Sequence, residues 1–483
     1  MKILLFLFLL NFNLVIAQAQ KPEKTLPVSQ EEFQELKNNI DTISTKLTEE
    51  NKSLKKDLET KSKEIDLFWL MIAGFLVFFM QAGFALVEAG FTRAKNAVNI
   101  LMKNLSDFAI GTVFFWLVGF GLMFGPQLFS GIGIGKLWGE GNLLGPSFLE
   151  GNIPSPSAFG FFFFQMVFAA TATTIASGAM AERTKFVSYL VYSLMMTAVI
   201  YPIFGSFAWK GLYGGTEKGF LEALGFIDFA GSTVVHSIGA WAGLAGTIIL
   251  KPRLDRFHHG KIEPIFGHNM SLATLGVFIL WFGWFGFNPG STGTISGASF
   301  TVIAVVTNAA AAAGVIGAML VSWIWFKLPD IGITLNGGLA GLVAITAGCN
   351  NLSITSALIV GFIAGALVVV GVMTLDKFQI DDPVGAVSVH GIAGAWGTLS
   401  VGLFANPNFG GNPEIKGLFF GGGFHQLGVQ ALGVLVAFLW AIASSLVVFF
   451  LLKKTIGLRV TEDEEIVGLD ILEHGNEAYP VSK

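Results

Sequence analysis

Eleven long apolar stretches constrain the fold of this chain more than any other feature of its sequence. A helix needs about 20 apolar residues to cross the hydrocarbon core of a bilayer. The stretches lie at 67–90, 105–126, 158–180, 186–207, 228–250, 267–289, 297–326, 334–350, 353–375, 383–404 and 424–452. Only 13% of the 483 residues are charged, whereas a soluble domain carries about 25%. The sequence therefore predicts an all-α membrane protein with eleven transmembrane helices in a membrane domain over 66–452.

The first residues of the chain are typical of a targeting signal rather than of a structural element. Lys2 is followed by an apolar run and by small residues at Ala17 and Ala19, which is the pattern of a signal peptide and its cleavage site. We therefore expect 1–19 to be a signal peptide and the mature chain to begin outside the cytoplasm. An uncleaved first helix is the alternative.

Segment 20–65 is polar, but apolar residues recur along it at spacings of three, four or seven residues. These residues are Phe33, Leu36, Ile40, Ile43, Leu47 and Leu54. Apolar positions that repeat every 3.5 residues or so, roughly twice per heptad, are typical of a coiled coil. We expect an extracytoplasmic coiled-coil segment that gathers several chains on the outer face. A lone solvated helix is the alternative.

The distribution of Lys and Arg predicts the orientation of the chain. With the N-terminus outside, the inner loops hold Arg93, Lys95, Lys103, Arg183, Lys185, Lys251, Arg253, Arg256, Lys261, Lys327 and Lys377. The outer loops hold only Lys136, Lys210, Lys218 and Lys416. Cytoplasmic loops carry an excess of these residues. We therefore expect an extracytoplasmic N-terminus, a cytoplasmic tail over 453–483, and a multi-pass location in the cell (inner) membrane.

Two of the apolar stretches contain a repeated motif with a histidine inside it. Asp228 precedes His236 by eight residues, and Asp382 precedes His390 by eight residues. In both, an isoleucine follows two residues after the histidine, and small residues with a tryptophan come next. Because five spans separate the motifs, their helices cross in opposite senses, as in an inverted five-plus-five repeat. Eight residues of helix span about 12 Å, so we expect both histidines near the membrane midplane and close together.

Ionisable side chains deep in a membrane are costly and usually face a pathway, although two unrelated structural histidines are the alternative. Neutral imidazole offers one donor and one acceptor and exchanges protons readily. The pair can therefore bind a small hydride, that is, a molecule of one heavy atom and its hydrogens, or it can relay a proton. Metal transport is disfavoured, because no Cys, Glu or third His lies at the same depth and metal sites usually recruit more ligands. We predict no metal and no cofactor.

Aromatic residues gather along the expected outer approach to the histidines, namely Phe168, Trp209, Trp284 and Phe287, with Ser291 beside them. A tryptophan face attracts a dehydrated cation by about 0.5–2 kcal/mol. An interfacial belt of packing aromatics is the alternative. Such a vestibule admits a weakly hydrated monovalent cation and passes its neutral form, because bare ions need rings of carbonyls or carboxylates. The net charge of −4 includes no basic block, so we expect no nucleic-acid partner.

Several motifs together resemble the ammonium transporter family, which also includes the Rhesus-type proteins. Segment 228–236 resembles the family signature, and 381–391 resembles its second-histidine motif. Segment 80–96 is similar to the family's first helix and the loop that follows it. The resemblance covers about 67–475 and leaves out only the N-terminal segments.

The resemblance implies an eleven-helix homotrimer with one pore per subunit that transports ammonium or ammonia, with methylammonium as a further substrate, and is not an enzyme. By motif it implies the pore histidines His236 and His390, the phenylalanine gate Phe168 and Phe287, the recruitment residues Trp209, Ser291 and Asp228, and the pore-lining Trp284. It further implies that the tail is regulatory and that a PII-type regulatory protein binds at the cytoplasmic face.

Two other functions remain open on the same resemblance. An ammonium sensor would be expected to carry a cytoplasmic output domain, and the roughly thirty residues after the last stretch are too few for one. A Rhesus-like channel for neutral gas would not need a cation recruitment site at Trp209 and Ser291. The chain also departs from the family pattern at Ala347, where a proline commonly follows the threonine.

Overall fold

The computed structural model describes residues 29–129, 131–135, 155–213, 217–258 and 261–480. The predicted signal peptide at 1–19 and the predicted outer-loop residue Lys136 lie outside these residues. The chain forms two compact units, Met1–Glu64 and Ile65–Lys483.

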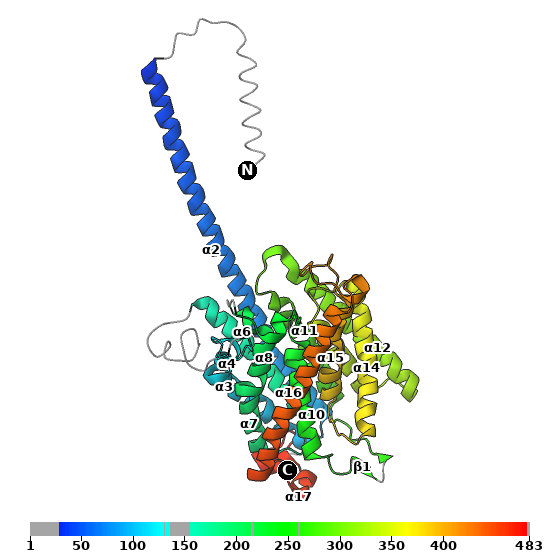
Figure 1. The fold of residues 1–483 in the computed structure, drawn as a ribbon. Coiled ribbons are helices and arrows are strands. Elements are labelled where there is room, and N and C mark those ends of the chain that lie inside the picture. The colour runs from blue at the N-terminus through cyan, green and yellow to red at the C-terminus, as the bar shows by residue number, and fades with distance from the viewer. Residues whose placement is uncertain (1–28, 130, 136–154, 214–216, 259–260, 481–483) are drawn as a thin grey trace. The chain divides into compact units, whose positions relative to one another are not determined.

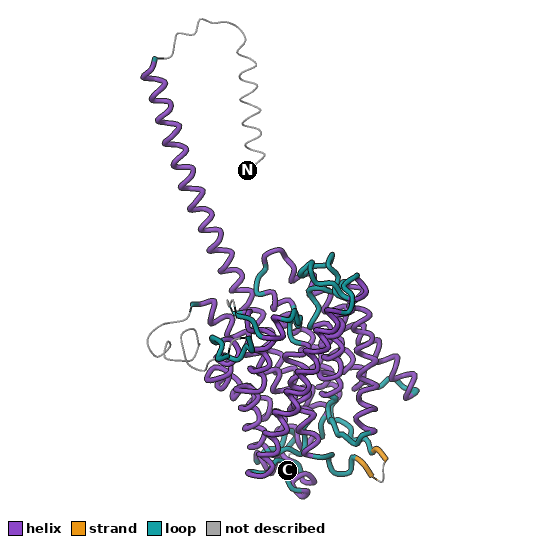
Figure 2. The backbone as a smooth tube through the Cα atoms, viewed as in Figure 1, coloured by secondary structure: helices purple, strands orange, loops and turns teal. Residues whose placement is uncertain are grey.

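Helices make up most of the described structure, as the purple tube of Figure 2 shows. The longer helices are α2 (Gln30–Phe91), α3 (Ala97–Phe114), α6 (Pro156–Ala179), α7 (Phe186–Met195), α10 (Ile238–Leu250), α11 (Met270–Phe287), α12 (Ser299–Phe326), α13 (Ile331–Thr346), α14 (Ile354–Lys377), α15 (Ala393–Phe404) and α16 (His425–Thr455). The shorter α-helices are α4 (Phe120–Phe124), α8 (Tyr201–Trp209), α9 (Phe220–Ala223), α17 (Glu462–Val467) and α18 (Leu469–His474).

Short 3-10 and π-helical turns join or extend these helices. They are η1 (Ala94–Asn96), η2 (Phe115–Gly119), η3 (Met196–Ile200), η4 (Lys210–Leu212), η5 (Ser232–Ser237), η6 (Pro289–Thr292), η7 (Ser296–Ala298), η8 (Val387–Ile392) and η9 (Leu418–Phe420). Within the described residues, the two named strands are β1 (Phe257–His258) and β2 (Lys261–Ile262), which pair antiparallel. The prediction of an all-α fold is confirmed.

Ten helical segments of the described chain are long and apolar enough to cross a membrane. The place of the eighth predicted stretch, 334–350, is taken by the shorter apolar helix α13, which has 16 residues. From Asn336 to Thr346 every residue of α13 is buried. The prediction of a multi-pass membrane protein is confirmed, and the count of eleven spans stays a prediction.

Side-chain caps begin four of the membrane helices. Ser155 accepts a hydrogen bond from Ala158 N at the start of α6, where proline follows the cap. Asn269, Asp330 and Ser353 cap α11, α13 and α14 in the same way. A capping oxygen satisfies one of the backbone N–H groups that a helix start leaves unpaired. These caps therefore fix where the chain enters each helix.

The N-terminal part of α2 carries the apolar stripe that predicted a coiled coil. The six stripe residues between Phe33 and Leu54 are 53–64% exposed in the single chain. A helix is therefore present here, and its apolar positions are more than half exposed. The coiled coil itself stays a prediction.

The C-terminal helices α17 and α18 lie at the same end of the membrane unit as the β1–β2 hairpin (Figure 1). Two of their carboxylates, Glu465 and Asp470, are buried. Glu465 accepts hydrogen bonds from Leu254 N and from the Arg459 guanidinium, both at 2.7 Å. Asp470 accepts from Val98 N and Asn99 N at 3.0 and 2.8 Å. The predicted tail is thus packed against the start of α3 and against the loop after α10.

Candidate functional site

The Asp228 carboxylate caps the N-terminal end of the π-helical turn η5, which contains His236. Its Oδ1 accepts hydrogen bonds from the backbone N–H groups of Gly231 and Ser232 at 3.0 and 2.8 Å. Its Oδ2 accepts from the next two residues, Thr233 and Val234, both at 2.8 Å. The carboxylate therefore satisfies the N–H groups that a helix start leaves free, and it sets the position of the histidine.

Gly231 makes this turn possible. Its φ of 111° is a left-handed conformation that glycine adopts without strain. A Cβ at this position would lie 2.6 Å from the Val235 side chain and 3.1 Å from the ring of Trp209. Any larger residue would push the turn away from the aspartate.

Asp382 repeats the arrangement at the start of η8, which contains His390. Its Oδ1 accepts from Ala386 N at 3.0 Å, and its Oδ2 accepts from Val387 N at 2.8 Å. Gly385 again has a positive φ, 78°, and a Cβ there would lie 2.6 Å from Asn336 Nδ2. The two motifs found in the sequence thus build the same local structure.

The two turns bring His236 and His390 into direct contact. Their Nδ1 atoms lie 3.2 Å apart, and their rings stack with centroids 5.2 Å apart and an interplanar angle of 20°. In such a pair one Nδ1 donates and the other accepts, so the two rings share a single proton between them. Among the described residues, no hydrogen-bond partner lies within reach of His236 Nε2, which is buried.

Aromatic rings continue the stack on one side of His236. Trp284 lies parallel to the imidazole at 5.0 Å, and Phe287 lies against it at 5.4 Å. Phe168 stacks on Phe287 with centroids only 4.0 Å apart and an interplanar angle of 16°. All three aromatic residues are buried. The indole N–H of Trp284 donates to Thr346 Oγ1 at 3.0 Å, which fixes the ring. We call Phe168, Phe287, His236 and His390 the stacked column.

A cavity of about 500 Å³ lies at the Phe168 end of the stacked column and is lined by Trp209 and Ser291 as well. We call it the aromatic cavity, because Phe161, Phe164, Tyr213 and Phe229 complete much of its wall. The Trp209 indole donates to the Asp228 carbonyl oxygen at 2.8 Å. The Ser291 hydroxyl donates to Phe287 O at 2.7 Å, so its lone pairs stay available.

A second cavity, of about 490 Å³, lies on the side of Asp382. Arg253 and Arg256 contribute to its wall, together with Asn336 and Gly385, and we call it the arginine-lined cavity. The stacked column and its two cavities come from helices far apart in sequence. The sequence predicted the residues of the column, but it did not predict the arginine-lined cavity.

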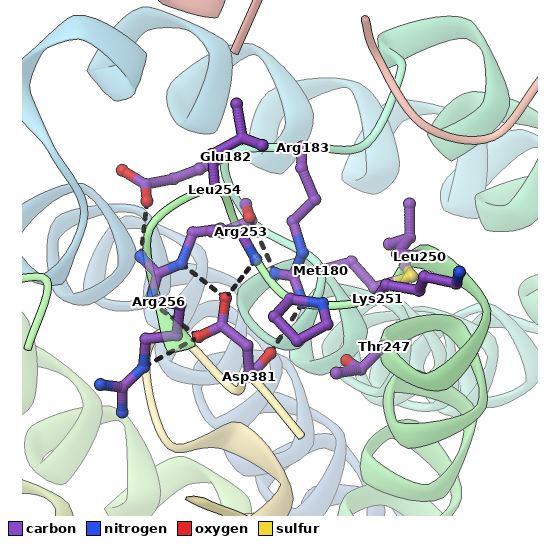
Figure 3. A network of polar contacts seen from close by, with 12 residues as sticks. Met180, Glu182, Arg183, Thr247, Leu250, Lys251, Arg253, Leu254, Arg256 and Asp381 are labelled. Atoms are coloured by element: carbon purple, nitrogen blue, oxygen red, sulfur yellow. Dashed lines mark hydrogen bonds and ion pairs between the residues drawn. The ribbon is translucent and has the colours of Figure 1, made fainter. Parts of the chain in front are cut away.

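A buried ion-pair network holds the chain beside this second cavity (Figure 3). Arg253 Nη1 contacts Glu182 Oε2 at 2.5 Å, and its Nε contacts Asp381 Oδ2 at 2.8 Å. Arg183 donates to the Asp381 carbonyl at 2.7 Å. Burial alone would raise the pKa of Glu182, but the guanidiniums of Arg253 and Arg93 lower it to about 2. Because Asp381 directly precedes Asp382, the network fixes the approach to η8.

The structure brings together most of the residues singled out from the sequence. The histidines, the two phenylalanines and Trp284 meet in or beside the stacked column, and Trp209 and Ser291 line the aromatic cavity. The Asp228 carboxylate is engaged by the backbone instead. Within the described ranges, no three His, Cys, Asp or Glu side chains gather in a way that could hold a metal ion.

The fold and the site define a multi-pass helical membrane protein built around a buried histidine pair. The model of the Ammonium Transporter Family matches residues 68–479. This chain belongs to the Ammonium Transporter Family, and the resemblance seen in the sequence is confirmed.

Individual relatives agree with this assignment. Ammonium transporter Amt2 of Archaeoglobus fulgidus is 45% identical over 431 residues, which cover 87% of this chain and 90% of that protein. A solved structure described as a Sensor Amt Protein superimposes with a TM-score of 0.80 at 42% identity, covering 86% of this chain and all of that one. The structure of Candida albicans Mep2 gives a TM-score of 0.73 at 28% identity, with coverages of 83% and 87%.

Proposed function

We propose that this protein transports ammonium across the cell (inner) membrane. It recruits NH4⁺ in the aromatic cavity, removes the proton, and conducts NH3, with or without the proton, past His236 and His390. The observation that carries the proposal is the stacked column, which separates the aromatic cavity from the arginine-lined cavity. Membership of a transporter family rather than an enzyme family supports it.

Recruitment rests on the chemistry of the aromatic cavity. The indole face of Trp209 attracts a cation by about 0.5–2 kcal/mol, and the ring is held in place by its bond to the Asp228 carbonyl. The lone pairs of Ser291 Oγ accept an N–H of ammonium, because the hydroxyl proton is already committed to Phe287 O. Asp228 supports the site through the backbone that it caps.

Passage beyond this cavity selects the neutral molecule. Phe168 and Phe287 form a gate whose rings are in contact, and they offer no ligand to a bare ion. An ion moved into such an apolar site without partners would pay a large desolvation cost. Ammonia carries no charge, and its N–H groups can bond to an imidazole acceptor of the histidine pair. Trp284 forms part of the pore lining.

The topology follows from the same assignment. Counting α13 as a span gives eleven, arranged as an inverted five-plus-five repeat, and the matched Asp–Gly–His turns at η5 and η8 support this symmetry. The excess of Lys and Arg in the predicted inner loops supports a position of the arginine-lined cavity and the 453–483 tail inside the cell. The N-terminus is then extracytoplasmic, which agrees with a signal peptide at 1–19.

The assembly is a homotrimer with one pore per subunit. The exposed apolar stripe of α2 supports a coiled coil over 20–65 on the outer face. On the inner face, the tail and the arginine-lined cavity offer a surface for a PII-type regulatory protein. Ammonium is the main substrate, and methylammonium is a second one.

The test is transport by purified protein in liposomes under an ammonium gradient. We compare the wild type with His236→Ala and Asp228→Ala, and we use His425→Ala as a matched control because His425 is exposed and lies outside the stacked column. The wild type and His425→Ala should carry ammonium, and the other two variants should show altered flux. Unchanged flux in both His236→Ala and Asp228→Ala would remove the twin-histidine mechanism.

An ammonium sensor is the second candidate function. The similarity to a structure described as a Sensor Amt Protein favours it. The same liposomes separate the two functions, because a sensor that does not transport would bind ammonium without any flux.

A further inference from the structure

Glu88 lies in a small cavity together with His390. The glutamate is on α2 and is 2% exposed. The cavity has a volume of about 20 Å³, and Phe84, Ile175, Leu280 and Val389 form most of the apolar wall around the two polar groups. A volume of about 10–15 Å³ is enough to hold one water molecule when polar partners are present. One water can therefore join the Glu88 carboxyl to the imidazole.

This cavity lies between the histidine pair and the arginine-lined cavity. Asn336 and Val384 line both cavities. Glu88 is also three residues before Phe91, which ends α2 and lines the arginine-lined cavity. Three residues of helix span about 4.5 Å. A carboxyl group is therefore placed on the inner side of the histidines, opposite the phenylalanine gate.

The other charged groups nearby are already engaged. From α3, the Asp107 carboxylate accepts hydrogen bonds from Tyr189 of α7 at 2.5 Å and Thr174 of α6 at 3.1 Å. Also from α3, Lys103 donates to the Thr184 carbonyl at 3.2 Å.

The Glu88 carboxylate has a lighter set of contacts. Among the described residues it accepts one hydrogen bond of standard geometry, from Asn104 Nδ2 at 3.3 Å. Ser177 of α6 lies beside it, and Lys103, Asp107 and Tyr189 act on it electrostatically. Of the described residues that line the small cavity, Glu88 is the only acidic one. It is therefore the carboxyl best placed to exchange a proton with His390.

We propose that Glu88 is the proton acceptor on the inner side of the histidine pair. The inference rests on the proposed transport of ammonium. The proton that NH4⁺ loses is held by the imidazoles as NH3 moves on. His390 then releases this proton through one water to the Glu88 carboxylate, which becomes a neutral carboxylic acid. The acid gives the proton to water in the arginine-lined cavity and returns to the carboxylate. One charge thus crosses for each NH3.

The test compares charge movement with substrate uptake in liposomes that contain the full-length protein. Current and uptake of labelled methylammonium are measured in parallel for the wild type, Glu88→Gln and Glu88→Asp. Glutamine keeps the shape and the bond to Asn104 but cannot take up a proton. Loss of a general acid–base group typically costs about 10²–10⁴-fold, so the current of Glu88→Gln should fall at least tenfold. Asp470→Asn removes a buried carboxyl of the C-terminal tail, outside the small cavity, and is the matched control.

The ratio of charge to methylammonium separates a relay from a structural role. A damaged fold lowers current and uptake together and leaves the ratio unchanged. Loss of a relay lowers the ratio in Glu88→Gln, while Glu88→Asp restores part of it and Asp470→Asn keeps the wild-type value. An unchanged ratio in Glu88→Gln would overturn the relay alone. Wild-type uptake without current would also overturn the relay and leave transport standing, whereas no wild-type uptake at all would overturn both.

Discussion

Asp228 and Asp382 have the same structural role in the two halves of the molecule, although the sequence suggested a role in recruitment for the first. Asp228 accepts four backbone N–H bonds and Asp382 accepts two. Each carboxylate caps a π-helical turn that carries a histidine. Short π-helical turns inside α-helices are often found at functional sites. The distance between the histidines therefore depends on two caps that lie outside the stacked column.

The unequal number of bonds gives a prediction for single substitutions. An asparagine at either position keeps one acceptor oxygen and loses the other together with the charge. We expect Asp228→Asn to destabilise the protein by about 1–3 kcal/mol, and Asp382→Asn to cost less because fewer N–H groups lose their partner. Thermal unfolding of the purified variants in detergent measures the difference. Equal melting temperatures for wild type and Asp228→Asn would show that the cap is not needed.

At the level of elements, the ion-pair network ties the end of α6 to the loop after α10 and to the start of η8. Glu182 and Arg253 are both buried, and the pKa of Glu182 is lowered from 4.5 to about 2. A carboxylate with a lowered pKa in the folded state stabilises the protein fully above its unfolded pKa. That stabilisation is lost as the pH falls through the folded pKa. The relevant window runs from about pH 4.5 down to about pH 2.

This network predicts a pH-dependent stability. The lowered pKa corresponds to about 3 kcal/mol at neutral pH. The melting temperature of the wild type should fall between pH 4.5 and pH 2 by more than that of Glu182→Gln, which has no proton to gain. Scanning fluorimetry in detergent across this range measures both slopes. Glu462→Gln is the control, because Glu462 is exposed. Parallel slopes for wild type and Glu182→Gln would contradict the assignment.

The first part of α2 gives a prediction about assembly. Its apolar stripe is more than half exposed at every position from Phe33 to Leu54. If these residues pack in a coiled coil, deletion of 25–60 should weaken trimers in detergent and leave transport per folded subunit intact. Native mass measurement gives the oligomer, and liposome uptake gives the transport. Loss of transport with trimers preserved would mean that this segment acts at the pore entrance or on a partner.

Across the whole molecule, hydropathy predicted where the membrane helices lie better than it predicted the residues at which they start. The stretch predicted at 105–126 begins as α3 at Ala97. The reason is that Lys103 and Asn104 are polar but buried inside the protein, so they do not meet lipid and do not end the helix. The short buried helix α13 is a second case, because a helix enclosed by other helices need not match the bilayer in length.

The candidate site was predictable where the sequence repeats itself. The matched Asp and His positions placed the histidine pair, and the structure shows their contact. The expectation that no Glu lies at the depth of the histidines was wrong, because Glu88 lines the same small cavity as His390. Glu88 is an ionisable residue within an apolar stretch, but it has no counterpart in a repeat. The partners of Arg253 lie 71 and 128 residues away in the chain. Such ion pairs depend on packing between helices, and no local sequence pattern predicts them.

In the proposed mechanism, the histidine pair and the gate before it allow passage of the neutral molecule and exclude bare cations. The most direct measurement is the current carried by ammonium and by potassium through liposomes with wild type or His236→Ala. We predict that the wild type responds to ammonium only, and that potassium conduction appears in His236→Ala. Potassium current through the wild type, or full ammonium selectivity in His236→Ala, would contradict the account.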